Sequence, residues 1–186
     1  MDPVVCFFYS FFKEIYWRVD IKRQDGWQGG GGDKLTRATV LAGPGWRQGM
    51  IAHIWSDKNF LVMDPASGID TGGVLQSTRY NDFSNLRWLG NKTGTTDLFS
   101  DANAGKWYCV IGHVKLNTPG VADGVFEFWI DDQLQVGSYH LNWHGNWNAD
   151  SKNYMINAVF FENYWNAGSP KLQERYLDNI LISSKP

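Results

Sequence analysis

The stretch Gly124–Asp131, which reads GVFEFWID, carries the clearest strand pattern in the chain. Successive side chains of a β-strand point to opposite faces, so Phe126, Phe128 and Ile130 share one face. That face is wholly apolar and is expected to pack in a core, while the residues between them point outward. The pair of aspartates at 131 and 132 is typical of a tight turn that reverses the chain into a hairpin.

Short runs of the same character recur on both sides of this stretch. They are rich in β-branched and aromatic residues and are bounded by Gly, Asn, Asp or Pro, which is typical of strands joined by turns. Between Tyr16 and Arg23, Trp17, Val19 and Ile21 alternate with other residues. No segment shows helical periodicity over three turns. The pattern predicts strands near 4–12, 15–23, 36–42, 49–55, 59–63, 85–89, 107–116, 124–130, 134–140, 154–161 and 175–183.

This spacing of strands and turns predicts an all-β protein, a two-sheet antiparallel jelly-roll sandwich. The chain has 186 residues, which suits a single domain spanning 1–186. Residues 1–13 are either a first core strand or a non-native or truncated N-terminal segment. Their apolar run is too short to span a bilayer and has no basic region before it, so it predicts neither a membrane anchor nor a signal peptide.

Composition narrows the function classes. The formal net charge is −2 with both signs spread along the chain, which argues against nucleic-acid binding because such proteins carry a basic stripe or arm. Aromatic residues make up 16% of the chain, including 10 Trp, more than a core readily hides. Some rings are therefore expected to be exposed for stacking on sugars. Two cysteines, Cys6 and Cys109, imply no disulfide framework, and whether they pair is left open.

Two polar regions are candidate binding loops. The stretch from Asp64 to Asp101 is rich in Gly, Ser, Thr, Asn and Asp, and loops of that length tend to be functional or ordered by their own contacts. The region Leu141–Asn153 carries Trp143 and Trp147 among Asn and Gly. Because Trp in a polar loop is not expected in a core, these two rings are predicted to bind substrate.

A second candidate site combines cations with a histidine. His53 and Trp55 share a strand face, which places a proton-transfer group beside a stacking surface. Lys34 and Arg37 lie where the glycine-rich loop of residues 29–32 enters a strand. Two cations there can neutralise a uronate carboxylate, as a polysaccharide lyase requires. The ordinary alternatives, a half-buried histidine and solvated cations, stay open.

Hydrolysis and metal chemistry have less support. A glycoside hydrolase needs two carboxylates about 5.5 Å or 6.5–9.5 Å apart, whereas Glu127 and Asp131 are about 13 Å apart along one strand. His113, His140 and His144 show no metal-binding spacing. No cofactor is expected to be required, although Asp178 is a candidate ligand for a structural Ca²⁺, with a structural hydrogen bond as its alternative role.

Several segments together resemble the polysaccharide lyase-like branch of the concanavalin A-like lectin and glucanase superfamily, similar to jelly-roll lyases that cleave alginate or glucuronan. The resemblance covers roughly residues 14–183 and implies a concave sheet that binds an extended polysaccharide, often one that contains uronate. The segments are Gly32–Leu35 (GDKL), Gly105–Cys109 (GKWYC), His113–Gly120 (HVKLNTPG), Asp123–Asp131 (DGVFEFWID), Phe160–Trp165 (FFENYW) and Arg175–Ile180 (RYLDNI).

The resemblance also assigns roles to individual residues. It matches Lys34 to the family's catalytic or carboxylate-binding lysine, and it places His53 on a groove strand. Alginate-type members carry a Y-x-Y pair on the next strand, but residues 59–63 read NFLVM here. Tyr139 and Tyr164 are candidate replacements in proton transfer. The missing pair favours a binding domain over an enzyme.

The sequence as a whole predicts a carbohydrate-binding jelly roll that recognises an extended polysaccharide in a concave groove. A lyase that cleaves a uronate polymer by β-elimination is the first alternative, and a structural or adhesion domain without a sugar site is the second. Neither nucleic acid nor membrane is an expected partner, the oligomeric state is left open, and the location is expected to be extracellular or periplasmic. The predicted substrate-binding residues are Trp55, Trp129, Trp143, Trp147, Trp165 and Glu127.

Overall fold

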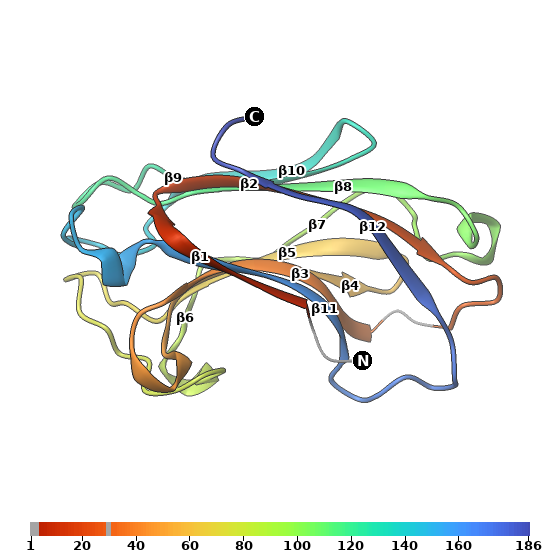
Figure 1. Cartoon of the computed structure of the whole chain (residues 1–186), viewed down its shortest axis with the longest axis horizontal. Coiled ribbons are helices and arrows are strands. Elements are labelled where there is room, and N and C mark those ends of the chain that lie inside the picture. Colours follow the sequence, from red (N-terminus) through yellow and green to blue (C-terminus); the bar gives the residue numbers. More distant parts are fainter. Residues whose placement is uncertain (1–3, 29–30) are drawn as a thin grey trace.

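A computed structural model describes residues 4–28 and 31–186, which form two antiparallel β-sheets packed face to face (Figure 1). The larger sheet has the strand order β1-β11-β3-β4-β5-β6, with β7 also paired to β5. The smaller sheet has the order β10-β9-β8-β2-β12. Neighbours in both sheets come from distant parts of the chain. The protein is therefore the expected all-β jelly-roll sandwich.

The strands of the larger sheet are β1 (Val4–Phe12), β3 (Gly31–Leu41), β4 (Gln48–Asp57), β5 (Phe60–Ser67), β6 (Arg87–Trp88), β7 (Lys92–Thr93) and β11 (Ile156–Trp165). Those of the smaller sheet are β2 (Glu14–Arg23), β8 (Tyr108–Lys115), β9 (Gly124–Ile130), β10 (Gln133–Leu141) and β12 (Arg175–Ser183). Short 3-10 helices are η1 (Pro44–Trp46), η2 (Phe83–Asn85), η3 (Asp101–Asn103) and η4 (Lys152–Tyr154).

Every predicted strand is present, with differences at the ends. β3 begins at Gly31 instead of near 36, and β11 runs on to Trp165 instead of ending near 161. These two extensions pair with each other, Tyr164 opposite Lys34 and Trp165 opposite Asp33. Pairing with Tyr164 and Trp165 thus extends the sheet through Asp33 and Lys34, residue types of weak intrinsic strand preference. The predicted flexible loop at 29–32 falls partly outside the described residues, and its end belongs to β3.

The alternating residues fill the space between the sheets. Trp17, Phe126 and Phe128 are fully buried in one continuous apolar cluster, as their alternation predicts. A Cβ at Gly112 would lie 2.3 Å from the Trp17 ring, so only glycine fits opposite that indole. The Asp131–Asp132 turn joins β9 to β10, and both residues have positive φ, as a two-residue hairpin turn requires.

The prediction for the 141–153 loop is wrong. Trp143 is 0% exposed and Trp147 is 3% exposed, so neither indole offers a face to a sugar. Their N–H groups donate to the backbone oxygens of Lys115, at 2.9 Å, and Asn117, at 2.8 Å. A buried indole needs such a partner, and here the backbone supplies it. The loop closes one part of the core and is not a stacking platform.

The long stretch after β5 is ordered by its own contacts, as predicted. The Asp82 carboxylate accepts hydrogen bonds from the Thr78 backbone and hydroxyl and from the side chains of Ser84 and Asn85. These bonds hold the pKa of Asp82 well below its usual range. The segment is thus a built loop, and it lies beside the outer face of the larger sheet.

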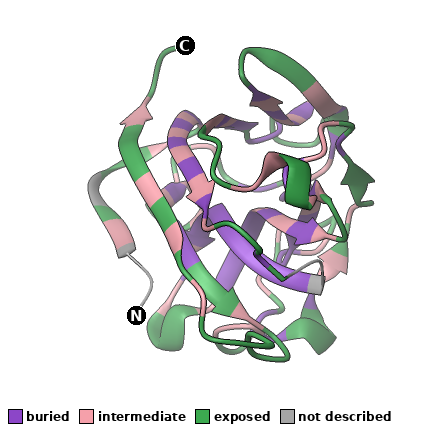
Figure 2. Ribbon diagram, turned by 90° about the vertical axis from the view of Figure 1, so that its right-hand side faces the viewer, coloured by how far each residue is buried: buried purple, intermediate pink, exposed green. Residues whose placement is uncertain are grey.

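The strand nearest the C-terminus forms an edge of the smaller sheet and is largely exposed. Figure 2 shows the strand that leads to the C-terminus, β12, as mostly exposed and intermediate. Asp178 on it is exposed, and its carboxylate accepts a hydrogen bond from the Asn179 backbone N–H at 2.7 Å.

Cys6 and Cys109 are unpaired and lie on different sheets. Within residues 4–28 and 31–186, no helix has the length and apolar character needed to cross a bilayer.

Candidate functional site

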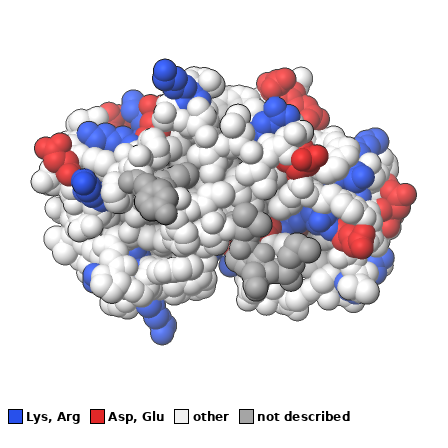
Figure 3. All heavy atoms as spheres, in the orientation of Figure 1, with Lys and Arg blue, Asp and Glu red and all other residues white. Residues whose placement is uncertain are grey.

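A groove runs over the outer face of the larger sheet. In Figure 1, loops descend below this sheet at both strand ends, from the 44–46 and 68–86 region on one side and from the β11–β12 connection on the other. Figure 3 shows the lower outline of the molecule drawn in between these two lobes, with acidic and basic side chains scattered over the visible face. Because these two lobes project from the sheet at opposite ends of its strands, the groove between them runs across the strands.

A β-bulge in β3 places two cations on the groove floor. Lys34 and Arg37 are three residues apart and would face opposite sides of a regular strand. In the β3–β4 pairing, Lys34 lies opposite residue 55 and Thr36 opposite residue 54, so β3 carries one extra residue there. The extra residue, Leu35, is buried in the core. The bulge thereby turns both cations toward the groove.

Arg37 is the most highly connected side chain of the floor. Its guanidinium donates to Glu162 Oε1 at 2.9 Å, to Asn81 Oδ1 at 3.3 Å and to the Tyr80 hydroxyl. The Arg37 and Glu162 side chains are nearly fully buried. The guanidinium also lies over the rings of Tyr80 and Phe160, 5.1 and 4.8 Å from their centroids. These contacts fix Arg37 in one orientation and leave Tyr80 above it.

His53 lies on β4 opposite Arg37 and faces the same groove. Its Nε2 is 3.4 Å from Glu162 Oε2, close enough for an ion pair but without hydrogen-bond geometry. Burial lowers the pKa of His53, and the cations Arg37 and Lys34 add to that effect against the opposing pull of Glu162. The imidazole is therefore neutral near pH 7 and available to accept a proton.

Lys34 and Glu162 complete the charge balance. Burial lowers the pKa of Lys34, although Glu162 opposes this. Burial raises the pKa of Glu162, but contact with His53 and the charges of Arg37 and Lys34 outweigh that effect, so the pKa is lowered overall. Two cations and one carboxylate leave about one positive charge on the floor. The Lys34 ammonium also lies 4.9 Å from the Tyr164 ring centroid.

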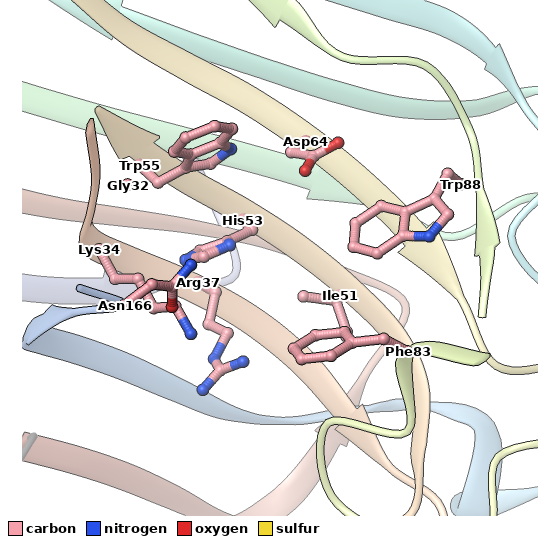
Figure 4. A pocket seen from close by; sticks show the side chains of 10 residues that line it. All are labelled: Gly32, Lys34, Arg37, Ile51, His53, Trp55, Asp64, Phe83, Trp88 and Asn166. Carbon is pink, nitrogen blue, oxygen red and sulfur yellow. The ribbon is translucent and has the colours of Figure 1, made fainter. Parts of the chain in front are cut away.

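Figure 4 shows the pocket that these residues form. Lys34, Arg37 and Asn166 lie on one side, Phe83 and Trp88 lie on the other, and His53 lies between them. The pocket continues past Asp64 and Trp88 toward Gly90 and Asn91. Its lining residues are Gly32, Lys34, Arg37, Ile51, His53, Trp55, Asp64, Phe83, Trp88 and Asn166.

The structure brings most of the predicted catalytic residues together with Trp55, one of the predicted substrate-binding residues. Lys34, Arg37, His53 and Trp55 all line this pocket, and Tyr164 projects beside Lys34. Trp165 lies apart from the pocket. Its ring stacks on Trp27 with centroids 5.5 Å apart, in a neighbouring hollow next to Arg175.

Three predicted residues lie on the other sheet, so their assignment to the groove is wrong. Trp129 belongs to the outer face of the smaller sheet, beside Tyr16 and Leu181. The Glu127 carboxylate lies on that face, and its Oε2 is 2.8 Å from His113 Nδ1. Tyr139 contacts Glu127, which raises the pKa of its phenol. Alternation within β9 was read correctly, but it does not say which sheet faces the sugar.

The assignment of Asp178 to a calcium site stays a prediction. Asp178 is exposed on the edge strand β12, and its carboxylate binds a backbone N–H. Among the described residues, no group of three or more His, Cys, Asp or Glu side chains is arranged to hold a metal ion.

Sequence reasoning missed Glu162, Tyr80 and Asn166. Glu162 comes one residue after the predicted end of its strand, and Tyr80 lies within the long polar stretch that was singled out as functional. Glu162 can be recognised as a site residue only once the pairing of β11 with β3 is known, because that pairing brings its carboxylate to Arg37.

Comparisons by sequence find nothing: no protein-family model matches the chain, and no curated protein matches it. Comparison of structures finds jelly-roll lyases. Alginate lyase vAL-1 from Chlorella virus is similar over 92% of this chain and 71% of its own, with a TM-score of 0.66 and 16% identity. The endo-β-1,4-glucuronan lyase from the fungus Trichoderma reesei is similar over 98% and 74%, with a TM-score of 0.63 and 14% identity.

A third solved structure gives the same result. The marine PL-14 alginate lyase from Aplysia kurodai is similar over 95% of this chain and 72% of its own, with a TM-score of 0.63 and 16% identity. The chain therefore shares the two-sheet jelly-roll fold of these lyases. At these identities the likeness concerns the fold.

Proposed function

We propose that this protein is a polysaccharide lyase that cleaves a uronate-containing polymer by β-elimination, acting outside the cell. The observation that carries the proposal is the convergence of Lys34, Arg37 and His53 in one groove with a phenol beside each cation. A lyase needs a cation for the carboxylate, a base for the C5 proton and an acid for the leaving oxygen. The jelly-roll lyases found by structure comparison support the same reading.

Each group has a defined part in the reaction. Lys34 and Arg37 neutralise the uronate carboxylate, which makes the neighbouring C5 proton more acidic. Neutral His53 accepts that proton. The C5–H electron pair forms the C4=C5 double bond while the C4–O4 bond breaks, and a phenol protonates the departing O4. The products are a new chain end and an unsaturated uronate.

Tyr80 is the proposed proton donor. Burial raises the pKa of its phenol, so the group is protonated near pH 7. Because its oxygen accepts from Arg37, its own proton remains free to be donated. Tyr164 is more than half exposed at the groove wall and is assigned to sugar stacking. This arrangement replaces the absent Y-x-Y pair with a tyrosine from the long loop.

Glu162 is a positioning residue in this scheme. It binds Arg37 and lies against His53, and its lowered pKa makes it a poor general acid. A glycosidase acid has the opposite property, a raised pKa. Glu162 therefore does not suit the role of a hydrolytic acid.

A carbohydrate-binding domain is the second candidate, and one observation favours it. The strand β5, where alginate-type lyases carry their tyrosine pair, offers only Phe60, Leu61, Val62 and Met63 before Asp64. If Tyr80 does not act as the acid, the groove retains its cations and aromatic rings and still binds sugar.

The test is elimination on a panel of polyuronates and mixed uronate polymers, followed by the ultraviolet absorbance of the unsaturated product. Replacement of His53 by Gln is expected to lower the rate by about 10²-fold or more, and Tyr80→Phe should have a similar effect. The matched control is His140→Gln, because His140 is an exposed histidine on β10. A flat absorbance with binding retained would favour the binding domain.

A further inference from the structure

The two halves of the groove differ in charge. The cationic half is formed by Lys34 and Arg37 on β3, and the acidic half by Asp64 on β5 together with Phe83 and Trp88. Figure 4 shows Asp64 between Trp55 and Trp88, on the side away from the two cations. A polymer bound across the strands therefore meets opposite charges at successive positions.

Strand register sets the spacing of these positions. Arg37 lies opposite His53, and His53 lies opposite Asp64, so the three residues form one row across β3, β4 and β5. Neighbouring strands are about 4.8 Å apart, so the backbones at Arg37 and Asp64 are separated by roughly 10 Å. A pyranose unit is about as long as one such step. A uronate whose carboxylate binds Lys34 and Arg37 thus covers the step from Arg37 to His53. The neighbouring unit then covers the step from His53 to Asp64.

Asp64 has no counter-charge. Its carboxylate forms no hydrogen bond or ion pair among the residues that the structure describes, and burial alone accounts for its raised pKa. Glu162 is the contrasting case, because Lys34 and Arg37 lower the pKa of that carboxyl. Among the described residues, the Arg37 guanidinium is thus paired with Glu162, whereas the Asp64 carboxylate has no partner of opposite charge.

The surroundings of Asp64 suit an uncharged sugar. Trp88 is 53% exposed and Phe83 is 54% exposed, and their rings stack with centroids 6.3 Å apart. Such rings accept the apolar face of a pyranose, and a free carboxylate accepts hydrogen bonds from sugar hydroxyls. A second uronate at this position would bring two carboxylates together, and juxtaposed like charges oppose binding.

We propose that Asp64, with Trp88, selects an uncharged sugar next to the uronate that is cleaved. The substrate class is then a mixed polysaccharide in which a uronate adjoins a neutral sugar, and a polymer of uronates alone is disfavoured. This inference rests on the proposed function for the position of the uronate, and it adds a specificity determinant that works by repulsion as well as attraction.

The experiment is calorimetric titration of the whole chain with two tetrasaccharides, one of glucuronate only and one that alternates glucuronate with an uncharged sugar. The wild type is expected to bind the alternating ligand at least about tenfold more tightly. Asp64→Asn keeps the shape and removes the charge, and it should bring the two affinities within about threefold by improving binding of the glucuronate ligand. Trp88→Ala, a change at an exposed position, should weaken binding of the alternating ligand more than binding of the glucuronate ligand.

The matched control is Asp132→Asn, which removes one negative charge at the β9–β10 turn, away from the groove, where asparagine also tolerates the positive φ. It should leave both affinities unchanged. The inference is overturned if the wild type binds the glucuronate ligand as tightly as the alternating one, if it binds neither, or if Asp64→Asn does not change the ratio.

Elimination with the same two ligands separates this inference from the proposed function. Discrimination in binding without elimination refutes the lyase and leaves the selectivity of Asp64 supported. Equal elimination of both ligands, unchanged by Asp64→Asn, supports the lyase and refutes the selectivity.

Discussion

His144 is expected to make the fold sensitive to acid. Its ring is 0% exposed, beside Trp147 and Tyr154, and neither ring nitrogen forms a hydrogen bond among the described residues. Burial lowers the pKa of His144 to about 4, and nearby backbone atoms of Trp143 and Tyr154 offset only part of that effect. In the unfolded chain the pKa returns to about 6.5.

The sign and the size follow from the linkage between protonation and folding. Between these two pKa values the unfolded chain binds the proton and the folded chain does not, so acid favours unfolding. Stability is fully present above about pH 6.5 and falls as the pH approaches 4. At about 1.4 kcal/mol per pKa unit, the loss is roughly 3 kcal/mol.

The assay is urea unfolding of the wild type and of His144→Gln at several pH values between 4 and 7.5. Other titrating groups contribute to both proteins, so the difference between their free energies of unfolding isolates His144. That difference should change by roughly 3 kcal/mol over this range. A difference that stays constant with pH would refute the reasoning.

Three further predictions concern the site and the core. Glu162→Gln leaves Arg37 without its buried counter-ion and should lower the free energy of unfolding by about 3–5 kcal/mol. Because Glu162 raises the pKa of His53, the same variant should move the acid limb of the kcat/KM profile to lower pH, and an unmoved limb contradicts the contact. Gly112→Ala puts a methyl group 2.3 Å from the Trp17 ring and should lower the free energy of unfolding, measured with urea, by about 1–3 kcal/mol. Gly72→Ala is the control and should lower it less, because its methyl group would lie 3.3 Å from the nearest atom. Trp143→Phe removes the hydrogen bond to the Lys115 carbonyl oxygen and should lower the free energy of unfolding by about 1–3 kcal/mol without weakening sugar binding. A loss of sugar affinity with unchanged stability would instead indicate that the 141–153 loop binds sugar.

Local patterns predicted the strands because alternation is a property of neighbouring residues. Gly124–Ile130 and Tyr16–Arg23 each have an apolar face whatever they pair with, and both faces are buried in the structure. The hairpin turn at Asp131 was equally local. The candidate residues Lys34, Arg37 and His53 were also found from the sequence, with the family resemblance supporting Lys34 and His53.

Other assignments failed because they depended on what lies across space. Trp143 and Trp147 sit in a polar stretch, yet backbone oxygens from another strand end satisfy their N–H groups and the core covers their rings. Trp129 and Glu127 alternate correctly but belong to the sheet away from the groove. Composition cannot distinguish these cases.

By itself the sequence determined the all-β class, the strand positions and the candidate residues Lys34, Arg37 and His53. Only the tertiary structure decided that a bulge at Leu35 turns both cations to one face, and that Glu162, 125 residues beyond Arg37, binds Arg37. It also decided that Asp64 lies in the same pocket as these cations without an ion pair among the described residues. The physical reason is that ion pairs and hydrogen bonds depend on register between strands, which residues distant in the sequence set together.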